Sequence, residues 1–144
     1  MDGPRVDLVT GAYGTTGRGI AARLLQDGRR VRTLTNHPDP SDATIEAHPY
    51  AFDGGLDAAF DGVDTFYNTF WARTGGADGF DALVERSSAL FDAARRAGVR
   101  RVVHLSVANP SLDSPYAYFR AKAQVAAGTP HAWSAASTWA LARK

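Results

Sequence analysis

The sequence contains no cysteine among its 144 residues. Disulfides, thiolate nucleophiles and thiolate metal ligands are therefore excluded. The chain also lacks an apolar run that approaches the roughly 18 residues of a membrane-spanning helix. Its first residues do not have the profile of a secretory signal. From these absences we expect a cytoplasmic protein that has no membrane partner.

A large excess of charge of either sign is also missing. The 16 lysines and arginines nearly balance the 15 acidic residues, so the formal net charge is +1. This balance gives no electrostatic basis for binding nucleic acid, which we do not expect as a partner. The 4 histidines are scattered without the spacing of metal ligands, so no metal site is expected.

Strand-like and helix-like segments alternate along most of the chain. The apolar content of 44% fits one globular domain. Apolar patterning predicts helices at 18–26, 56–60, 80–97 and 115–127, and strands at 6–10, 30–35, 45–52, 63–69 and 99–106. Such alternation is typical of an α/β fold, a doubly wound parallel sheet with helices on both faces.

A glycine-rich turn, Gly11-Ala12-Tyr13-Gly14-Thr15-Thr16-Gly17, separates the first expected strand from the first expected helix. Residues without a Cβ permit a tight turn and the close approach of a pyrophosphate. The helix amino terminus beyond the turn offers free N–H groups, and the two threonines can add hydroxyl donors. No Gly-Lys-Ser/Thr follows, which excludes a P-loop. A glycine turn that binds nothing is the alternative, but the flanking strand and helix favour a dinucleotide site.

Four segments together resemble the short-chain dehydrogenase/reductase superfamily, closest to its atypical branch with NmrA-like and NAD-dependent epimerase-like members. They are 10–20 (TGAYGTTGRGI), 63–69 (VDTFYNT), 99–106 (VRRVVHLS) and 114–122 (SPYAYFRAK). The resemblance covers about residues 5–125. It implies a Rossmann-like sheet of strand order 3-2-1-4-5, an NAD or NADP cofactor, and oxidoreductase or epimerase-like chemistry on a small molecule.

Cofactor choice in this fold depends on the residues that close the second strand, which face the adenosine ribose. Here these are Asn36 and His37, neither of which is an acid or a permanent cation. Arg18, just after the third glycine, is a candidate partner for a 2′-phosphate; a solvated arginine at a helix start is the alternative. The sequence therefore favours NADP slightly over NAD.

Three further residues are candidates for cofactor contact. The resemblance implies that Asp53, after the third strand, contacts the adenine edge, although it could equally cap the short helix that follows. Asn68 and Thr69 end the fourth strand, where ligands bind in doubly wound sheets. An asparagine at a strand end can also simply form a turn.

Tyr118 and Lys122 are four residues apart in an expected helix, so their side chains share one face. A nearby ammonium group favours the phenolate and lowers a tyrosine pKa. Together with Ser106 at the end of the fifth strand, they resemble the Ser–Tyr–Lys catalytic triad of the superfamily. Tyr116 competes with Tyr118 for the role, and an exposed Tyr/Lys pair with no function is the alternative.

The resemblance ends soon after Lys122. Residues 126–144 contain no valine or isoleucine, so the sixth strand that the family would add is doubtful. We expect an NAD(P)-binding domain at 1–127 and an atypical tail at 128–144 that is disordered or read out of frame in a truncated chain. A non-catalytic NAD(P) sensor of NmrA-like type and a nonfunctional fragment therefore stand as alternatives to an enzyme.

Overall fold

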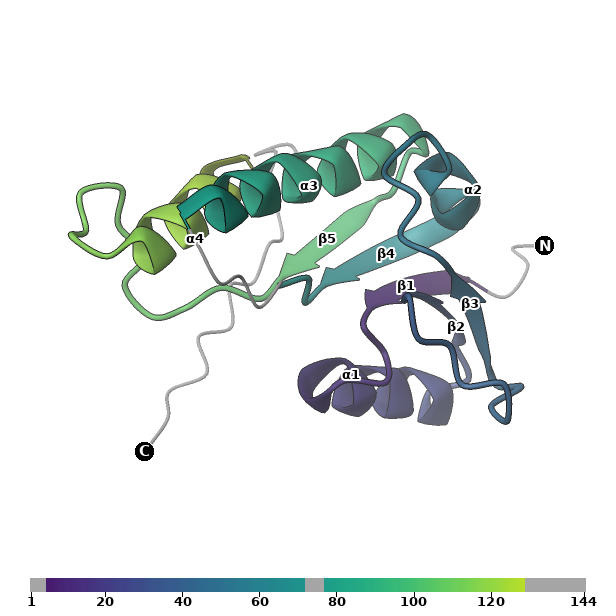
Figure 1. The fold of residues 1–144 in the computed structure, drawn as a ribbon. Helices are drawn as coiled ribbons and strands as arrows, with labels where there is room; N and C mark the ends of the chain where they lie inside the picture. The colour runs from purple at the N-terminus through teal and green to yellow at the C-terminus, as the bar shows by residue number, and fades with distance from the viewer. Residues whose placement is uncertain (1–4, 72–76, 129–144) are drawn as a thin grey trace.

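The computed structural model describes residues 5–71 and 77–128, which form five strands and four helices (Figure 1). Strands and helices alternate along the chain, except that the third strand follows the second without a helix between them. The strands are β1 (Val6–Thr10), β2 (Arg30–Leu34), β3 (Ile45–His48), β4 (Val63–Asn68) and β5 (Arg101–His104). The helices are α1 (Thr15–Gln26), α2 (Leu56–Phe60), α3 (Ala77–Arg96) and α4 (Ala117–Gly128).

All strand pairs are parallel, and the sheet order is β3-β2-β1-β4-β5. This order confirms the predicted doubly wound α/β fold. The chain continues from β1 to β2 on one side, whereas β4 pairs with the other side of β1. Such a switch point opens a crevice beyond the carboxyl ends of the two strands, where doubly wound sheets bind ligands. The region of the doubtful sixth strand, 129–144, lies outside the described residues.

The helices form one layer on each face of the sheet. Helix α1 covers β1 and β2 on one face, whereas α2, α3 and α4 lie together on the other (Figure 1). Each layer has its own apolar core. The smaller core, under α1, comprises Val9, Ala12, Ala21, Leu24, Val31 and Ile45. The larger core, under the other helices, is centred on fully buried Leu8, Phe60, Phe66, Leu90, Phe91 and Val102.

Several element boundaries differ from the sequence prediction. Helix α1 begins at Thr15 rather than at residue 18, because the glycine turn itself supplies the first helical turn. Strand β3 ends at His48 rather than at residue 52, since Pro49 has no N–H to donate to a ladder. Strand β5 is shorter than predicted, and α3 starts at Ala77. Within 5–71 and 77–128, no helix is long and apolar enough to cross a membrane.

Candidate functional site: a glycine-lined cleft at the carboxyl ends of the strands

Each of the three glycines of the turn is needed for a different structural reason. Gly11 has a φ of +64°, in the left-handed region that a side chain disfavours. Gly14 is extended, and a Cβ there would lie 3.2 Å from the Gly11 carbonyl oxygen. At Gly17 the same oxygen would be only 2.1 Å from a Cβ. Gly17 therefore lets α1 pack directly on the turn, and the other two glycines shape the turn itself.

Buried threonines fix the turn to the sheet. The Thr33 hydroxyl accepts a 3.0 Å hydrogen bond from the Ala12 N–H and donates a 2.7 Å bond to the Val9 carbonyl. At the end of β4, the Thr69 N–H donates to the Thr10 hydroxyl at 2.7 Å, and the Thr69 hydroxyl donates to the Thr10 carbonyl at 2.5 Å. Nothing in the sequence pattern singled out Thr10 and Thr33, because a threonine in a strand gives no signal that its hydroxyl bonds to a neighbouring loop.

A cleft of about 510 Å³ opens between the turn and the end of β4. It therefore lies at the switch point between β1 and β4. The lining residues are Thr10, Gly11, Gly14, Thr15, Thr16, Gly17, Tyr50, Thr69, Phe70 and Trp71. Most of the predicted glycine-turn residues and Thr69 thus meet at one cavity. Tyr50, Phe70 and Trp71 add an aromatic wall opposite the turn.

The amino terminus of α1 faces this cleft without a competing cap. Gly14 is the N-cap residue, no side chain caps the helix, and its first turn holds no acid. The first intrahelical bond from this end runs from the Arg18 N–H to the Gly14 carbonyl, at 2.9 Å. Among the described residues, the N–H groups of Thr15, Thr16 and Gly17 are thus the unpaired donors of a helix start, which suit an anion. Because side chains are absent at Gly11, Gly14 and Gly17, the cradle fits a dinucleotide diphosphate.

Arg18 and His37 line a neighbouring cavity of about 430 Å³ together with Tyr13. The Arg18 guanidinium donates a 3.2 Å hydrogen bond to the Tyr13 carbonyl. Two acids, Asp39 and Asp42, share this lining. Their carboxylates already accept hydrogen bonds from the following serine and threonine, and the Ser41 bonds lower the pKa of Asp39.

Asn36, Asp53 and Asn68 lie outside both cavity linings. The Asn36 side-chain oxygen Oδ1 accepts a 3.4 Å hydrogen bond from the Tyr50 N–H and so ties the loop after β2 to the chain just after β3. Asp53 is exposed on the turn before α2. The expectation that Asp53 caps α2 is wrong, because the N-cap is Gly55 and no side chain caps that helix.

The Asn68 side chain is buried at the end of β4, with 1% of its surface exposed. Its Nδ2 lies 3.1 Å from His104 Nδ1, and its Oδ1 accepts a 3.0 Å bond from the Phe70 N–H. Asn68 thus links the ends of β4 and β5. Its bond to the Phe70 N–H also shapes the turn that leads from β4 to the aromatic residues of the cleft wall.

Tyr118 and Lys122 lie on α4 beside Trp71. The Lys122 Nζ is 3.8 Å from the centre of the Trp71 ring, and the Tyr118 ring meets that indole edge-on at a centroid distance of 5.1 Å. Lys122 is buried, and this burial lowers the pKa of its ammonium to about 8. Tyr118 remains about one third exposed. The predicted pair is therefore joined to the cofactor cleft through a tryptophan that both residues contact.

Ser106 is buried just beyond β5, with a hydroxyl that has no hydrogen-bond partner among the described residues. His104, two residues earlier, is also buried, and its Nε2 is likewise unpaired within the described part of the chain. Burial, together with the Lys122 ammonium, lowers the pKa of His104 to about 4, so the ring is neutral. Across 5–71 and 77–128, no hydrogen bond joins Ser106, Tyr118 and Lys122 to one another, and no metal-ligand cluster occurs.

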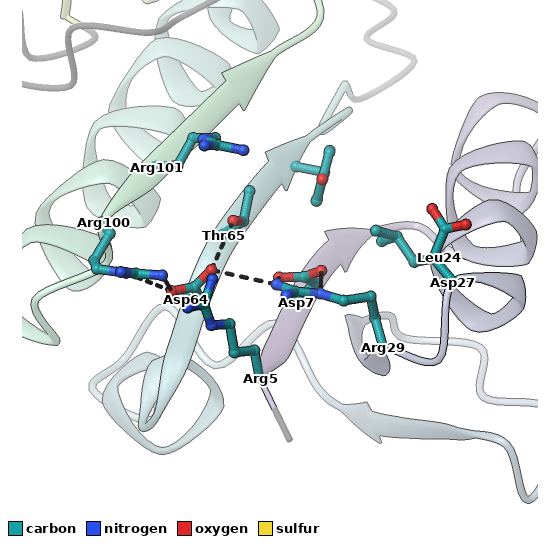
Figure 2. Close-up of a pocket in the computed structure, with 10 residues that line it drawn as sticks. Arg5, Asp7, Leu24, Asp27, Arg29, Asp64, Thr65, Arg100 and Arg101 are labelled. Carbon is teal, nitrogen blue, oxygen red and sulfur yellow. Dashed lines mark hydrogen bonds and ion pairs between the residues drawn. The ribbon is translucent and has the colours of Figure 1, made fainter. Parts of the chain in front are cut away.

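A second polar cleft lies at the opposite, amino-terminal edge of the strands (Figure 2). Asp7, with 1% of its side chain exposed, receives two hydrogen bonds from Arg29 at 2.6 and 2.7 Å. Asp64 pairs with both Arg29 and Arg100. Burial alone would raise the pKa of Asp64, but the bonds from the two arginines outweigh it and lower the pKa. This network ties strand starts together, far from the glycine turn.

Comparisons with known proteins agree with this geometry. A model of a family described as NAD(P)H-binding matches residues 11–136. A short-chain dehydrogenase/reductase superfamily protein from Agrobacterium tumefaciens, solved with bound NAD, is 26% identical with a TM-score of 0.71 over 86% of this chain and 44% of that chain. A search of curated proteins found no match.

Two further solved structures share the fold. Triphenylmethane reductase from Citrobacter sp., complexed with NADP(H), is 18% identical with a TM-score of 0.66, covering 86% of this chain and 45% of that one. UDP-N-acetylglucosamine 4-epimerase from Bacillus cereus is 19% identical with a TM-score of 0.70, covering 88% and 48%. The chain thus spans less than half the length of each structure. Because the family model matches most of its length and its fold is Rossmann-like, of the short-chain dehydrogenase/reductase type, the chain belongs to the NAD(P)H-binding family.

Proposed function

We propose that the chain is the cofactor-binding part of an oxidoreductase or epimerase-like enzyme that acts on a small molecule. The proposal rests on one observation: a single tryptophan contacts both the glycine-lined cleft and the Tyr118–Lys122 pair. Trp71 lines the glycine cleft and contacts both Tyr118 and Lys122. A dinucleotide site and an acid–base pair that share a wall are what proton-coupled hydride transfer requires.

The glycine turn, the start of α1 and Thr69 would hold the dinucleotide, which supplies or accepts a hydride when bound. The uncapped N–H groups of α1 orient its diphosphate. Tyr118 then gives a proton to the substrate oxygen, or takes one from it, through the phenol hydroxyl. Ser106 positions that oxygen with its unpaired hydroxyl. Lys122, one turn later on α4, supplies a positive charge on the same helix face.

The Lys122 environment supports this division of roles. Burial holds the pKa of Lys122 near 8, so the ammonium is still mostly charged at neutral pH. Its charge acts in a poorly hydrated setting, where electrostatic effects on a neighbour are stronger than in water. We also propose that NADP(H) is preferred over NAD(H), because Arg18 is the permanent cation of the cavity that His37 lines.

Tyr118→Phe tests the catalytic assignment. We expect oxidation of NADPH or NADH with a panel of small ketones and aldehydes to fall about 10²–10⁴-fold in kcat, because the proton donor is lost. The dissociation constant for the cofactor should stay within about twofold of the parent, since Tyr118 does not line the cleft. The matched control is Tyr116→Phe, which removes the hydroxyl of a more exposed tyrosine; equal losses in both variants would contradict the assignment.

A non-catalytic dinucleotide sensor is the second candidate. The observation that favours it is that Lys122 faces the Trp71 indole, and no hydrogen bond links it to Tyr118 within the described residues. A sensor would bind the cofactor and show no turnover in the parent, and Tyr118→Phe would then change neither binding nor activity.

A further inference from the structure

Trp71 occupies the junction between the cofactor cleft and α4. It comes three residues after the end of β4, and its side chain lines the cleft together with the glycine turn. The indole packs against Phe80 of α3 at a centroid distance of 6.2 Å and against Tyr118 of α4. One residue therefore contacts the cleft, α3 and α4.

Within the part of the chain that the structure describes, the Lys122 ammonium has no carboxylate or hydrogen-bond acceptor as its partner. No carboxylate forms an ion pair with it among residues 5–71 and 77–128, and only 6% of its surface is exposed. The titratable groups around it are His104 at the end of β5, which is neutral, and Tyr118 one turn earlier on α4. A buried, unpaired ammonium is costly. The compensating group that the structure does show is the indole face, 3.8 Å away.

We propose that Trp71 is a positioning residue of the cofactor site, whose indole holds the Lys122 ammonium at the wall of the glycine cleft. This inference rests on the proposed role of Lys122 in that site. The negative face of an indole attracts a cation, and the attraction is strongest where water is excluded. Trp71 thus fixes where the lysine charge sits and keeps it charged beside the cleft.

An apolar side chain without an aromatic ring separates this role from simple packing. Trp71→Leu keeps an apolar cover over Lys122 but removes the π-face. The charged form of Lys122 then loses its partner while burial persists, so its pKa should fall further. Trp71→Phe keeps an aromatic face and should restore most of the parent behaviour. A side chain that merely filled space would show no such dependence on aromaticity.

The lysine content of the chain makes the measurement direct. The sequence contains two lysines, Lys122 and Lys144. NMR of the 144-residue chain labelled with ¹³C-lysine therefore gives two side-chain titrations, with Lys144 as an internal reference. We expect the Lys122 pKa to fall by roughly half a unit or more in Trp71→Leu and by less in Trp71→Phe. Lys144 should not change.

Phe52→Leu is the matched control, because it removes an aromatic ring under a different cation, Arg86, 5.5 Å away. It should leave the Lys122 titration unchanged.

Dissociation constants for NADPH and NADH should rise about fivefold or more in Trp71→Leu and remain near the parent values in Trp71→Phe. An unchanged or raised Lys122 pKa in Trp71→Leu would overturn the inference. Should that variant fail to fold, Trp71→Met, which also lacks an aromatic face, decides by the same criterion.

The titration needs no substrate, so its result is separable from that of the proposed function. A parent protein without turnover, but with a Lys122 pKa that depends on Trp71, would remove the enzyme proposal and leave the positioning role intact. If turnover depends on Tyr118 but the Lys122 pKa does not change when Trp71 is replaced, the enzyme proposal stands and the positioning role of Trp71 is lost.

Discussion

Gly17 and Gly19 lie two residues apart in α1 but face different surroundings. A Cβ on Gly17 would overlap the Gly11 carbonyl oxygen, whereas a Cβ on Gly19 would meet nothing within 4 Å. We expect Gly17→Ala to lower the free energy of unfolding by about 1–3 kcal/mol through overpacking. Gly19→Ala should raise it by about 0.5–1 kcal/mol, because alanine favours a helix interior. Urea unfolding of the two variants checks both signs; destabilisation of equal size would contradict the assigned role of Gly17.

Arg18 carries the prediction on cofactor choice. If its guanidinium receives a 2′-phosphate, Arg18→Ala should weaken NADPH binding about tenfold and leave NADH binding nearly unchanged. Asp42→Asn removes a carboxylate from the same cavity and should strengthen NADPH binding. Calorimetric titration of both cofactors into each variant is the measurement. A loss of equal size for NADPH and NADH would show that Arg18 does not read the 2′ position.

The sequence predicted some of the single-residue roles and not others, for physical reasons. Glycines at fixed spacing between a strand and a helix signal a close approach of backbones, and the structure contains that approach at Gly17. The position of Asn68 predicted a cleft residue, yet its side-chain amide is hydrogen-bonded to the His104 ring and to the Phe70 N–H. Trp71 was a candidate for the wall of a substrate or nicotinamide pocket, with core packing favoured instead; the structure places it in the cleft lining, and its partners on α3 and α4 are too distant in sequence to be predicted.

At the scale of elements, the amino-terminal ends of the strands are joined by the charged network of Figure 2. Asp7 belongs to β1 and Asp64 to β4, and Arg29 bridges them from the residue before β2. Parallel strands have no hairpin to set their register. Ion pairs at their starts hold neighbouring strands together at a point where the chain has no local connection.

Asp7→Asn tests that network. The substitution leaves Arg29 partly unpaired in a largely buried setting, and we expect a loss of about 2–4 kcal/mol in the free energy of unfolding. Asp92→Asn is the matched control, since Asp92 pairs with Arg95 on the exposed side of α3 and should cost less than about 1 kcal/mol. Equal effects in urea unfolding would mean that the buried network contributes no more than a surface ion pair.

The order and type of the elements were predictable, and their ends were less so. Periodicity identified every strand and helix of the described residues because each has a buried face. The start of α1 was missed because the threonines and glycine at 15–17 look like a loop, although the packed turn stabilises them as a helix. The expectation that Asp53 caps α2 failed because position before a helix is necessary for a cap but not sufficient.

At the scale of the whole molecule, the buried His104 makes stability depend on pH. Its folded pKa is about 4, below the value near 6.5 of an unfolded histidine. The unfolded chain therefore binds the extra proton first as the pH falls, and stability decreases between about pH 6.5 and 4. We expect a loss of about 2–3 kcal/mol across that window.

His104→Gln removes this titration while an amide can still accept from Asn68. The decline in the free energy of unfolding between pH 6.5 and 4 should become shallower by about the same amount. The depressed pKa of Asp64 adds a separate loss below about pH 4, which the variant should retain. An unchanged slope between pH 6.5 and 4 would show that His104 is not the group responsible.

The proposed function requires that the glycine turn of this chain binds a dinucleotide diphosphate. Isothermal titration calorimetry of the full chain and of Gly14→Val, each with NADPH and NADH, tests it most directly. We predict that the parent binds at least one cofactor in a 1:1 complex and that the valine, whose side chain enters the cradle, weakens binding at least about tenfold, while Gly19→Ala binds as the parent does. A parent that binds neither cofactor, or a Gly14→Val variant that binds as tightly as the parent, would contradict the account.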